Sequence, residues 1–165
     1  MKLKTHGMHT SDSAADRFAF LDLAEDFFRE LQVQPPPPRT FDDQFPLTLS
    51  FEVDGQHFEL THDPEPGCDH FVLECRFGSV PADAAVPALK RLLEGNAVLD
   101  PHGGIVFGID EESGHVLCMR REPVQGTSAS AMLDDLHAMA ELAATWQQTW
   151  FLELPGPDNA TSMQD

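Results

Sequence analysis

Basic residues are scarce in this chain. Lys and Arg total 10 against 28 Asp and Glu, the formal net charge is -18, and no Lys or Arg follows Arg121. Such a charge repels phosphate backbones and anionic lipid surfaces, so it argues against nucleic-acid and membrane-surface binding. No apolar run approaches the ~18–20 residues that a membrane-spanning helix needs, and we expect no membrane insertion.

Cysteine is also sparse. Cys68, Cys75 and Cys118 are odd in number and show no Cys-x-x-Cys spacing, which is typical of a reducing cytosol rather than of a disulfide framework. The N-terminal stretch carries two lysines but lacks the apolar core of a signal peptide. We therefore expect a soluble protein of the cytoplasm.

The motifs of common enzyme classes are missing. There is no Gly-x-Ser-x-Gly, and the Gly103-Gly104 pair is followed by neither a lysine nor a helix start that could cradle a phosphate. Eight histidines keep a metal-dependent enzyme open as an alternative. His57 and His62 lie on one predicted strand but point to opposite faces, and no regular zinc spacing is present. We predict no catalytic residue, no cofactor and no metal.

A folded body is nevertheless indicated. The chain has 165 residues, 41% hydrophobic residues and 12 phenylalanines, enough for one domain with its own core. We expect a flexible N-terminus over residues 1–12, a single domain over 13–154 and a flexible tail over 155–165. The surplus of acid then keeps a partly apolar surface in solution.

The first helix is predicted to begin at Ser13, a suitable N-cap. Phe18 lies beside charged positions, where either a staple-like contact near the helix start or a partner would explain it. The prolines at 35–38 end the helix and favour a stiff connector over a ligand for another domain. The remaining apolar residues form a band roughly 160° wide, more than one packing face needs. They are Phe20, Leu21, Leu23, Ala24, Phe27, Phe28 and Leu31.

Alternation predicts strands over 47–53, 56–63 and 70–78, the first two joined by an Asp54-Gly55 turn. A helix follows over 81–99, with an apolar stripe of Leu89, Leu92, Leu93 and Ala97 and with Gly95 as a mild indication of a helix–helix contact. A second hairpin, GGIVFGID and GHVLCMRREP, precedes a last helix over 127–154, whose stripe is expected to pack on the sheet. The predicted fold is α+β, an antiparallel sheet of about five strands with three helices in the order α-β-β-β-α-β-β-α.

This order and the wording of several segments resemble the class I chaperones of type III secretion, the Tir-chaperone family. The matching segments are the Phe-rich first helix, FDDQFPLTLSFEVDGQHFELTHD, LLEGNAVLDPHGGIVFGID, and GHVLCMRREP leading into the acidic last helix. They cover roughly residues 16 to 152. The tetraproline connector is longer and stiffer than is usual in that family, and DPEPGCD widens the second turn.

The resemblance implies a non-enzymatic homodimer of the bacterial cytoplasm that binds the extended N-terminal segment of a secreted effector and keeps it export-competent, with the secretion ATPase as a further partner. The dimer interface would include Leu89, Leu92, Leu93, Asn96, Ile105 and Phe107. The effector-binding grooves would include Leu21, Phe28, Phe51 and Met119. A small acidic adaptor or regulator that binds a folded secretion or transcription component is the alternative function.

Overall fold

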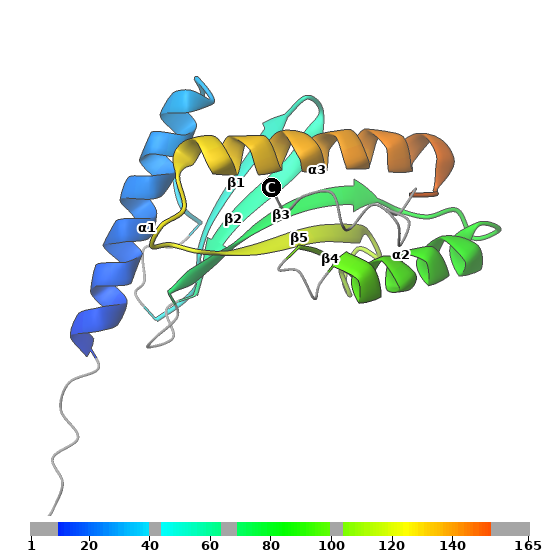
Figure 1. Ribbon diagram of the computed structural model, residues 1–165, viewed down its shortest axis with the longest axis horizontal. Coiled ribbons are helices and arrows are strands. Elements are labelled where there is room, and N and C mark those ends of the chain that lie inside the picture. The colour runs from blue at the N-terminus through cyan, green and yellow to red at the C-terminus, as the bar shows by residue number, and fades with distance from the viewer. Residues whose placement is uncertain (1–9, 40–43, 64–68, 100–103, 153–165) are drawn as a thin grey trace, which may run out of the picture.

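The computed structural model of the protein describes residues 10–39, 44–63, 69–99 and 104–152. Three helices and five strands follow one another in the predicted order, and the predicted α+β class is confirmed. Figure 1 shows them along the chain. The elements are α1 (Thr10–Glu30), β1 (Leu47–Val53), β2 (Gln56–His62), β3 (His70–Gly78), α2 (Ala85–Leu99), β4 (Ile105–Ile109), β5 (Val116–Pro123) and α3 (Ala129–Thr149).

The strands form one antiparallel sheet in the order β1-β2-β3-β5-β4. Asp54 and Gly55 connect β1 and β2 with φ angles of 52° and 75°, the two left-handed positions of a tight hairpin turn. The register then places Val53 opposite Gln56 and Phe51 opposite Phe58. The strand boundaries predicted from alternation are confirmed, apart from the end of β2 at His62, because each strand buries every second residue.

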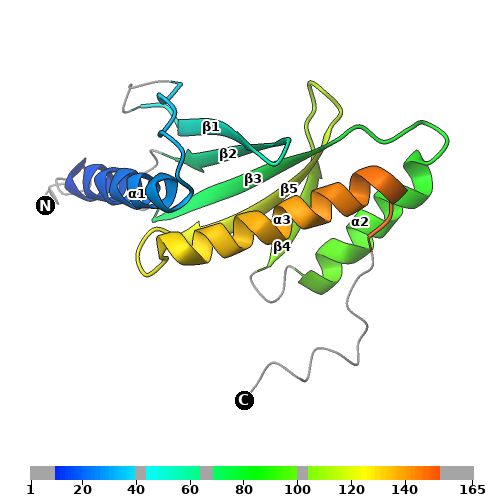
Figure 2. The ribbon, with the colours of Figure 1, turned by 90° about the horizontal axis from the view of Figure 1, so that it is seen from above.

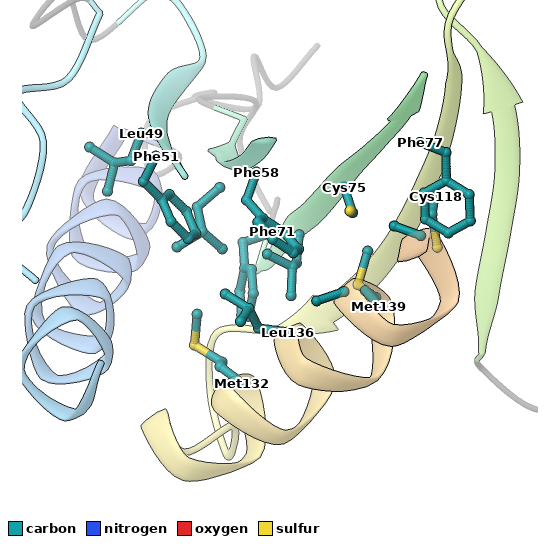
Figure 3. Packing of buried hydrophobic residues seen from close by; sticks show 14 of the residues in the cluster. Leu49, Phe51, Phe58, Phe71, Cys75, Phe77, Cys118, Met132, Leu136 and Met139 are labelled. Atoms are coloured by element: carbon teal, nitrogen blue, oxygen red, sulfur yellow. The ribbon is translucent and has the colours of Figure 1, made fainter. Parts of the chain in front are cut away.

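The core lies between one face of the sheet and two helices. Helices α1 and α3 contact each other, α3 packs on β3, and both lie on the same side of the sheet (Figure 2). Inward-pointing side chains such as Phe58, Phe71 and Cys75 meet Leu136 and Met139 of α3 (Figure 3). None of the three helices covers the opposite face (Figure 2). That face is therefore available for other contacts.

Helix α3 begins and ends with recognisable caps. The side chain of Ser128 accepts a hydrogen bond from the backbone N–H of Ala131, and Trp150 adopts a left-handed conformation whose N–H bonds the carbonyl of Trp146. The helix therefore ends at Thr149, before the predicted end. Its predicted stripe is buried as far as Trp146, through Met132, Leu136, Met139 and Ala143, whereas the last predicted member, Trp150, is half-buried at the C-cap.

Helix α1 corrects two expectations. It begins at Thr10, three residues before the predicted N-cap Ser13, so the predicted flexible N-terminus is helical at its end; the rest of that segment lies outside the described residues. Phe18 is 68% exposed, so the staple-like contact is wrong. The predicted band has a buried part and a half-buried part. Phe20, Phe27 and Phe28 are fully buried, whereas Leu21, Leu23 and Leu31 are half-buried.

Helix α2 begins at Ala85, later than predicted, and its apolar residues lie on two sides. Ala88, Leu92 and Gly95 are buried, whereas Leu93 is 69% exposed and Ala97 is also exposed. The single stripe predicted from the sequence is therefore wrong. The main neighbour of α2 is β4 rather than another helix, and the helix–helix contact inferred from Gly95 stays a prediction.

Candidate functional site

The outward side of α2 is the first candidate surface. Val86 is 80% exposed and Leu93 69%, and three and four residue steps join Val86, Leu89, Leu93 and Ala97 on one side of the helix. Ile109 at the end of the neighbouring strand β4 is also exposed. We call these five residues the α2 surface. Large apolar side chains gathered at one place mark a contact site more strongly than the same side chains scattered singly.

A pair of hydrogen bonds fixes α2 to the edge strand β4. The side-chain amide of Asn96 donates to the carbonyl of Phe107 over 2.9 Å and accepts from the N–H of the same residue over 2.7 Å. Both backbone groups of Phe107 on the open side of β4 are thereby satisfied. The helix covers part of an edge that would otherwise present unpaired groups to another strand.

The six residues predicted for the dimer interface fall into three groups. Leu92 and Phe107 are 4% and 6% exposed and belong to the core of the single chain. Asn96 joins α2 to β4. Leu93 is exposed, while Leu89 and Ile105 are half-buried and pack against the core. The structure thus leaves Leu93 as the strongest of these candidates for a contact with another chain, with Leu89 beside it on the α2 surface.

An apolar groove of about 420 Å³ lies between α1 and the segment that follows it. We call it the connector groove. Its helical side includes Leu21, Ala24 and Phe28, and its floor includes Leu49 of β1. The opposite wall is formed by the residues after the helix, namely Val33, Pro35, Pro36 and Pro38; Glu25 and Arg29 complete the lining. Sequence reasoning treated the prolines as a connector and missed that they build a wall.

The connector is held against the sheet at Arg39. Its backbone N–H donates to the carbonyl of Thr48 over 3.2 Å, and its guanidinium pairs with Glu59 of β2. The carbonyl of Thr48 therefore points away from β2. Since backbone polar groups alternate along a strand, Ser50 and Glu52 also direct theirs to the free edge of β1.

A second hollow, of about 560 Å³, lies on the sheet face that no described helix covers. We call it the outer-face groove. Val106 of β4 stands opposite Met119 of β5, and Val72 of β3 stands opposite Arg121. The lining is His70, Val72, Gly104, Val106, Met119, Arg121 and Pro123.

The four residues predicted to bind an effector do not form one surface. Leu21 and Phe28 line the connector groove, although Phe28 is itself fully buried. Phe51 lies beneath them in the core. The centroid of its ring is 5.0 Å from the ring centroid of Phe28 and 5.7 Å from that of Phe58. Met119 lines the outer-face groove. The predicted residues therefore lie at two separate grooves, and Phe51 packs in the core beneath the first of them.

The described residues offer little reactive chemistry. Within them no group of three His, Cys, Asp or Glu side chains could hold a metal ion. Burial raises the pKa of the Cys75 thiol to about 12 and that of Cys118 well above its ordinary value, so neither is a ready nucleophile. None of the helices in the described ranges has the length and apolar character of a membrane span. The open surfaces are suited to binding.

Solved structures with the same fold support this interpretation of the architecture. The Yersinia pestis type III secretion chaperone SycH, solved with a fragment of YscM2, has a TM-score of 0.60 and 19% identity over 76% of this chain and 98% of its own. A chain of the HopA1–SchA chaperone–effector complex has a TM-score of 0.60 and 23% identity over 82% of this chain and 98% of its own. The ExsC–ExsE complex gives 0.59 and 20% over 84% and 95%.

A comparison with curated protein sequences finds no match. The model of the Tir chaperone protein (CesT) family, in contrast, matches residues 22–147. That range extends from the middle of α1 almost to the end of α3, so it includes the outer-face groove, the α2 surface and all of the connector groove except Leu21. Since the match covers well over half of the sequence, the chain belongs to the Tir chaperone protein (CesT) family.

Proposed function

We propose that this protein is a type III secretion chaperone that binds the extended N-terminal segment of a secreted effector and keeps that segment soluble and export-competent. The observation that carries the proposal is an open apolar groove beside a free strand edge, in a chain of the Tir chaperone family. The protein acts by binding and uses no nucleotide. Transfer of the effector to the secretion ATPase is the step that follows.

The connector groove and the edge of β1 suit an extended guest chain. A strand added beside β1 would bond to the backbone groups of Ser50 and Glu52 that face the free edge. Its alternate side chains would enter the groove between Leu21 and the proline wall, where they would be removed from water. Backbone pairing tolerates many sequences, and the apolar groove selects segments that would otherwise aggregate.

The proposal includes a homodimer formed through the α2 surface. Val86, Leu93 and Ala97 are exposed on the side of α2 away from its own core, and the half-buried Leu89 borders them. Two copies related by a twofold axis would bury that face against itself, as an isologous contact requires. A dimer also provides two connector grooves to one guest chain, and this second site lengthens the interface that must offset the cost of ordering the guest.

Co-expression with the effector encoded beside this gene tests the function. We expect the effector to remain soluble and to co-elute with the chaperone in size-exclusion chromatography with light scattering, and limited proteolysis to show protection of an unfolded N-terminal segment. Protection of a folded domain would instead indicate an adaptor. An effector that stays insoluble together with a monomeric chaperone would contradict the proposal.

A groove variant links the function to the site. Leu21→Glu places a charge among the apolar side chains of the connector groove and should reduce effector recovery about tenfold or more, in line with the cost of burying an unpaired charge. Ala138→Glu adds the same charge at an exposed position of α3 and should leave recovery unchanged. Equal recovery from both variants would remove the connector groove from the proposal.

A further inference from the structure

The outer face of the sheet carries an apolar strip that the proposed function has not used. Val72, Leu117 and Met119 project from adjacent strands β3 and β5, and Val106 of β4 stands opposite Met119. All four are half-buried, and no helix in the described ranges lies over them. The strip continues from the outer-face groove toward the other end of β5.

Two arginines flank this strip. Most cations in the described ranges are engaged: Arg29, Arg39, Lys90, Arg91 and Arg120 each form an ion pair with a carboxylate. Arg76 and Arg121 form no ion pair with any described residue, although Glu74 and Asp110 lie within electrostatic reach of Arg76. In a chain with a formal net charge of -18, these two guanidinium groups on one face remain available to pair with carboxylates of a partner.

The register fixes how far apart the two arginines lie. Arg121 stands opposite Val72, and Arg76 stands opposite Leu117, four residues further along each strand. Four residues of strand span about 13 Å. An extended guest also repeats its side-chain direction every two residues, so its residues i and i+4 would be separated by the same distance and face the same side.

The centre of the strip is shaped to accept an apolar side chain. A Cβ atom added to Gly108 would lie only 2.8 Å from the terminal methyl of Met119, so the methionine side chain lies across the glycine. Methionine adapts to guests of different shape because it is unbranched and flexible. Glu74 stands opposite Met119 and is half-buried, which disfavours a guest carboxylate at this central position.

We infer that the outer-face groove and its flanking arginines bind an extended guest segment of the pattern acidic-x-apolar-x-acidic. The central apolar side chain lies over Met119, midway between the two arginines, and the two carboxylates pair with Arg76 and Arg121. This inference rests on the proposed function, because it assigns a sequence preference to the guest chain. A second copy of the protein is a weaker occupant, since the α2 surface already provides an apolar face for it. The net charge disfavours nucleic acid.

Fluorescence anisotropy with a labelled peptide containing Asp-Ser-Leu-Ser-Asp tests the inference. We expect the full chain to bind this peptide about five- to tenfold more tightly than the peptide with both Asp replaced by Asn, because charge-assisted hydrogen bonds are lost. A peptide whose acids are two residues apart should bind as weakly as the Asn peptide. Equal binding of the Asp and Asn peptides would overturn the inference.

Variants of the protein locate the site. Arg121→Gln and Arg76→Gln should each remove the affinity gained from the one peptide carboxylate that the arginine pairs with. Each variant should therefore bind the Asp peptide about three- to fivefold more weakly than the wild type does. Gln148→Glu changes the net charge by the same amount at an exposed position of α3 and should bind as the wild type does. If Gln148→Glu weakens binding as much as Arg121→Gln, general charge repulsion is responsible and the site is wrong.

Two controls separate folding and function from this site. Arg76→Lys keeps the charge at the half-buried position and should recover part of the affinity if Arg76→Gln folds poorly; no recovery in a well-folded Lys variant counts against a role for Arg76. Effector co-purification tests the proposed function separately. If the protein keeps its effector soluble but binds the Asp and Asn peptides equally, the proposed function holds and the inferred peptide pattern is wrong.

Discussion

Leu92 and Leu93 are neighbours on α2, and they have opposite environments: Leu92 is 4% exposed and Leu93 is 69% exposed. The helix turns by about 100° per residue, so adjacent leucines cannot both face the same neighbour. Leu92 packs into the core with Ala88, whereas Leu93 lies on the α2 surface with Val86. One helix therefore supports the fold of the single chain and leaves an apolar face exposed, which is the face proposed for the dimer.

Substitution of Leu93 tests the dimer. Leu93→Glu would place two like charges at a self-complementary contact, so we expect a monomer in light scattering at concentrations at which the wild type is a dimer. The far-ultraviolet circular dichroism spectrum should be unchanged, because this side chain is not part of the core. A variant that stays dimeric would show that the α2 surface is not the interface.

Leu92 should behave differently in the same assay. Leu92→Ala removes a buried side chain and should lower the free energy of unfolding by about 2–5 kcal/mol, without a direct effect on association. The double variant Leu92→Ala, Leu93→Glu is compared with Leu93→Glu alone in urea unfolding. This comparison measures the loss without a contribution from subunit dissociation. A loss below about 1 kcal/mol would contradict the core position of Leu92.

Asn96 provides a second test of the α2–β4 contact. Asn96→Ala removes both hydrogen bonds to the backbone of Phe107 and should cost about 1–3 kcal/mol in the free energy of unfolding. Asn96→Asp keeps an acceptor for the Phe107 N–H but loses the donor to the carbonyl. Its stability should therefore lie between that of the wild type and that of Asn96→Ala. Urea denaturation with an unchanged m-value measures the effect. Equal stability of Asn96→Ala and the wild type would exclude this clamp.

The strands were predictable because their signals are local. Period-two alternation and the Asp54-Gly55 turn specify β1 and β2 without reference to the rest of the chain, and the register follows from the turn. The stripe of α3 was also predictable, because that helix has one apolar face. The sheet order depends on pairing between distant strands, and no residue pattern in the sequence specified it.

The candidate site was only partly predictable, because exposure is decided by tertiary packing. The leucines of α2 have the same chemistry in the sequence, and only the position of β4 determines which of them is covered. Phe28 and Phe51 are apolar residues of the predicted segments, yet both belong to the core beneath the connector groove. The proline wall required a contact between Arg39 and Thr48, which no sequence motif announces.

Two buried free cysteines on neighbouring strands give a prediction about thiol reactivity. Cys75 and Cys118 stand opposite each other on β3 and β5, both fully buried under α3 (Figure 3). With a pKa of about 12, the thiolate fraction of Cys75 at pH 8 is on the order of one in ten thousand. We expect neither residue to be alkylated by iodoacetamide in the native protein, and both to react after denaturation. Rapid native labelling in a peptide map would contradict their burial.

Glu74 gives a prediction about pH. Burial, followed by repulsion from Glu59, raises its pKa above the ordinary value of 4.5, although Arg76 partly opposes the shift. Since folding favours the protonated form, the ionised carboxylate lowers stability above the folded-state pKa. This penalty fades as the pH falls through the folded-state pKa and is absent below the unfolded-state pKa.

Glu74→Gln should therefore unfold at a higher temperature than the wild type at pH 7, and the difference should shrink as the pH falls toward 4.5 and disappear well below that value, where the wild-type side chain is protonated in both states. Glu111→Gln, an exposed turn residue with the same change in net charge, separates the local effect from the general reduction of negative charge. Differential scanning calorimetry across this pH range measures both variants. If Glu74→Gln is destabilising at pH 7, or matches Glu111→Gln at every pH, then the attraction of Arg76 outweighs the burial of Glu74.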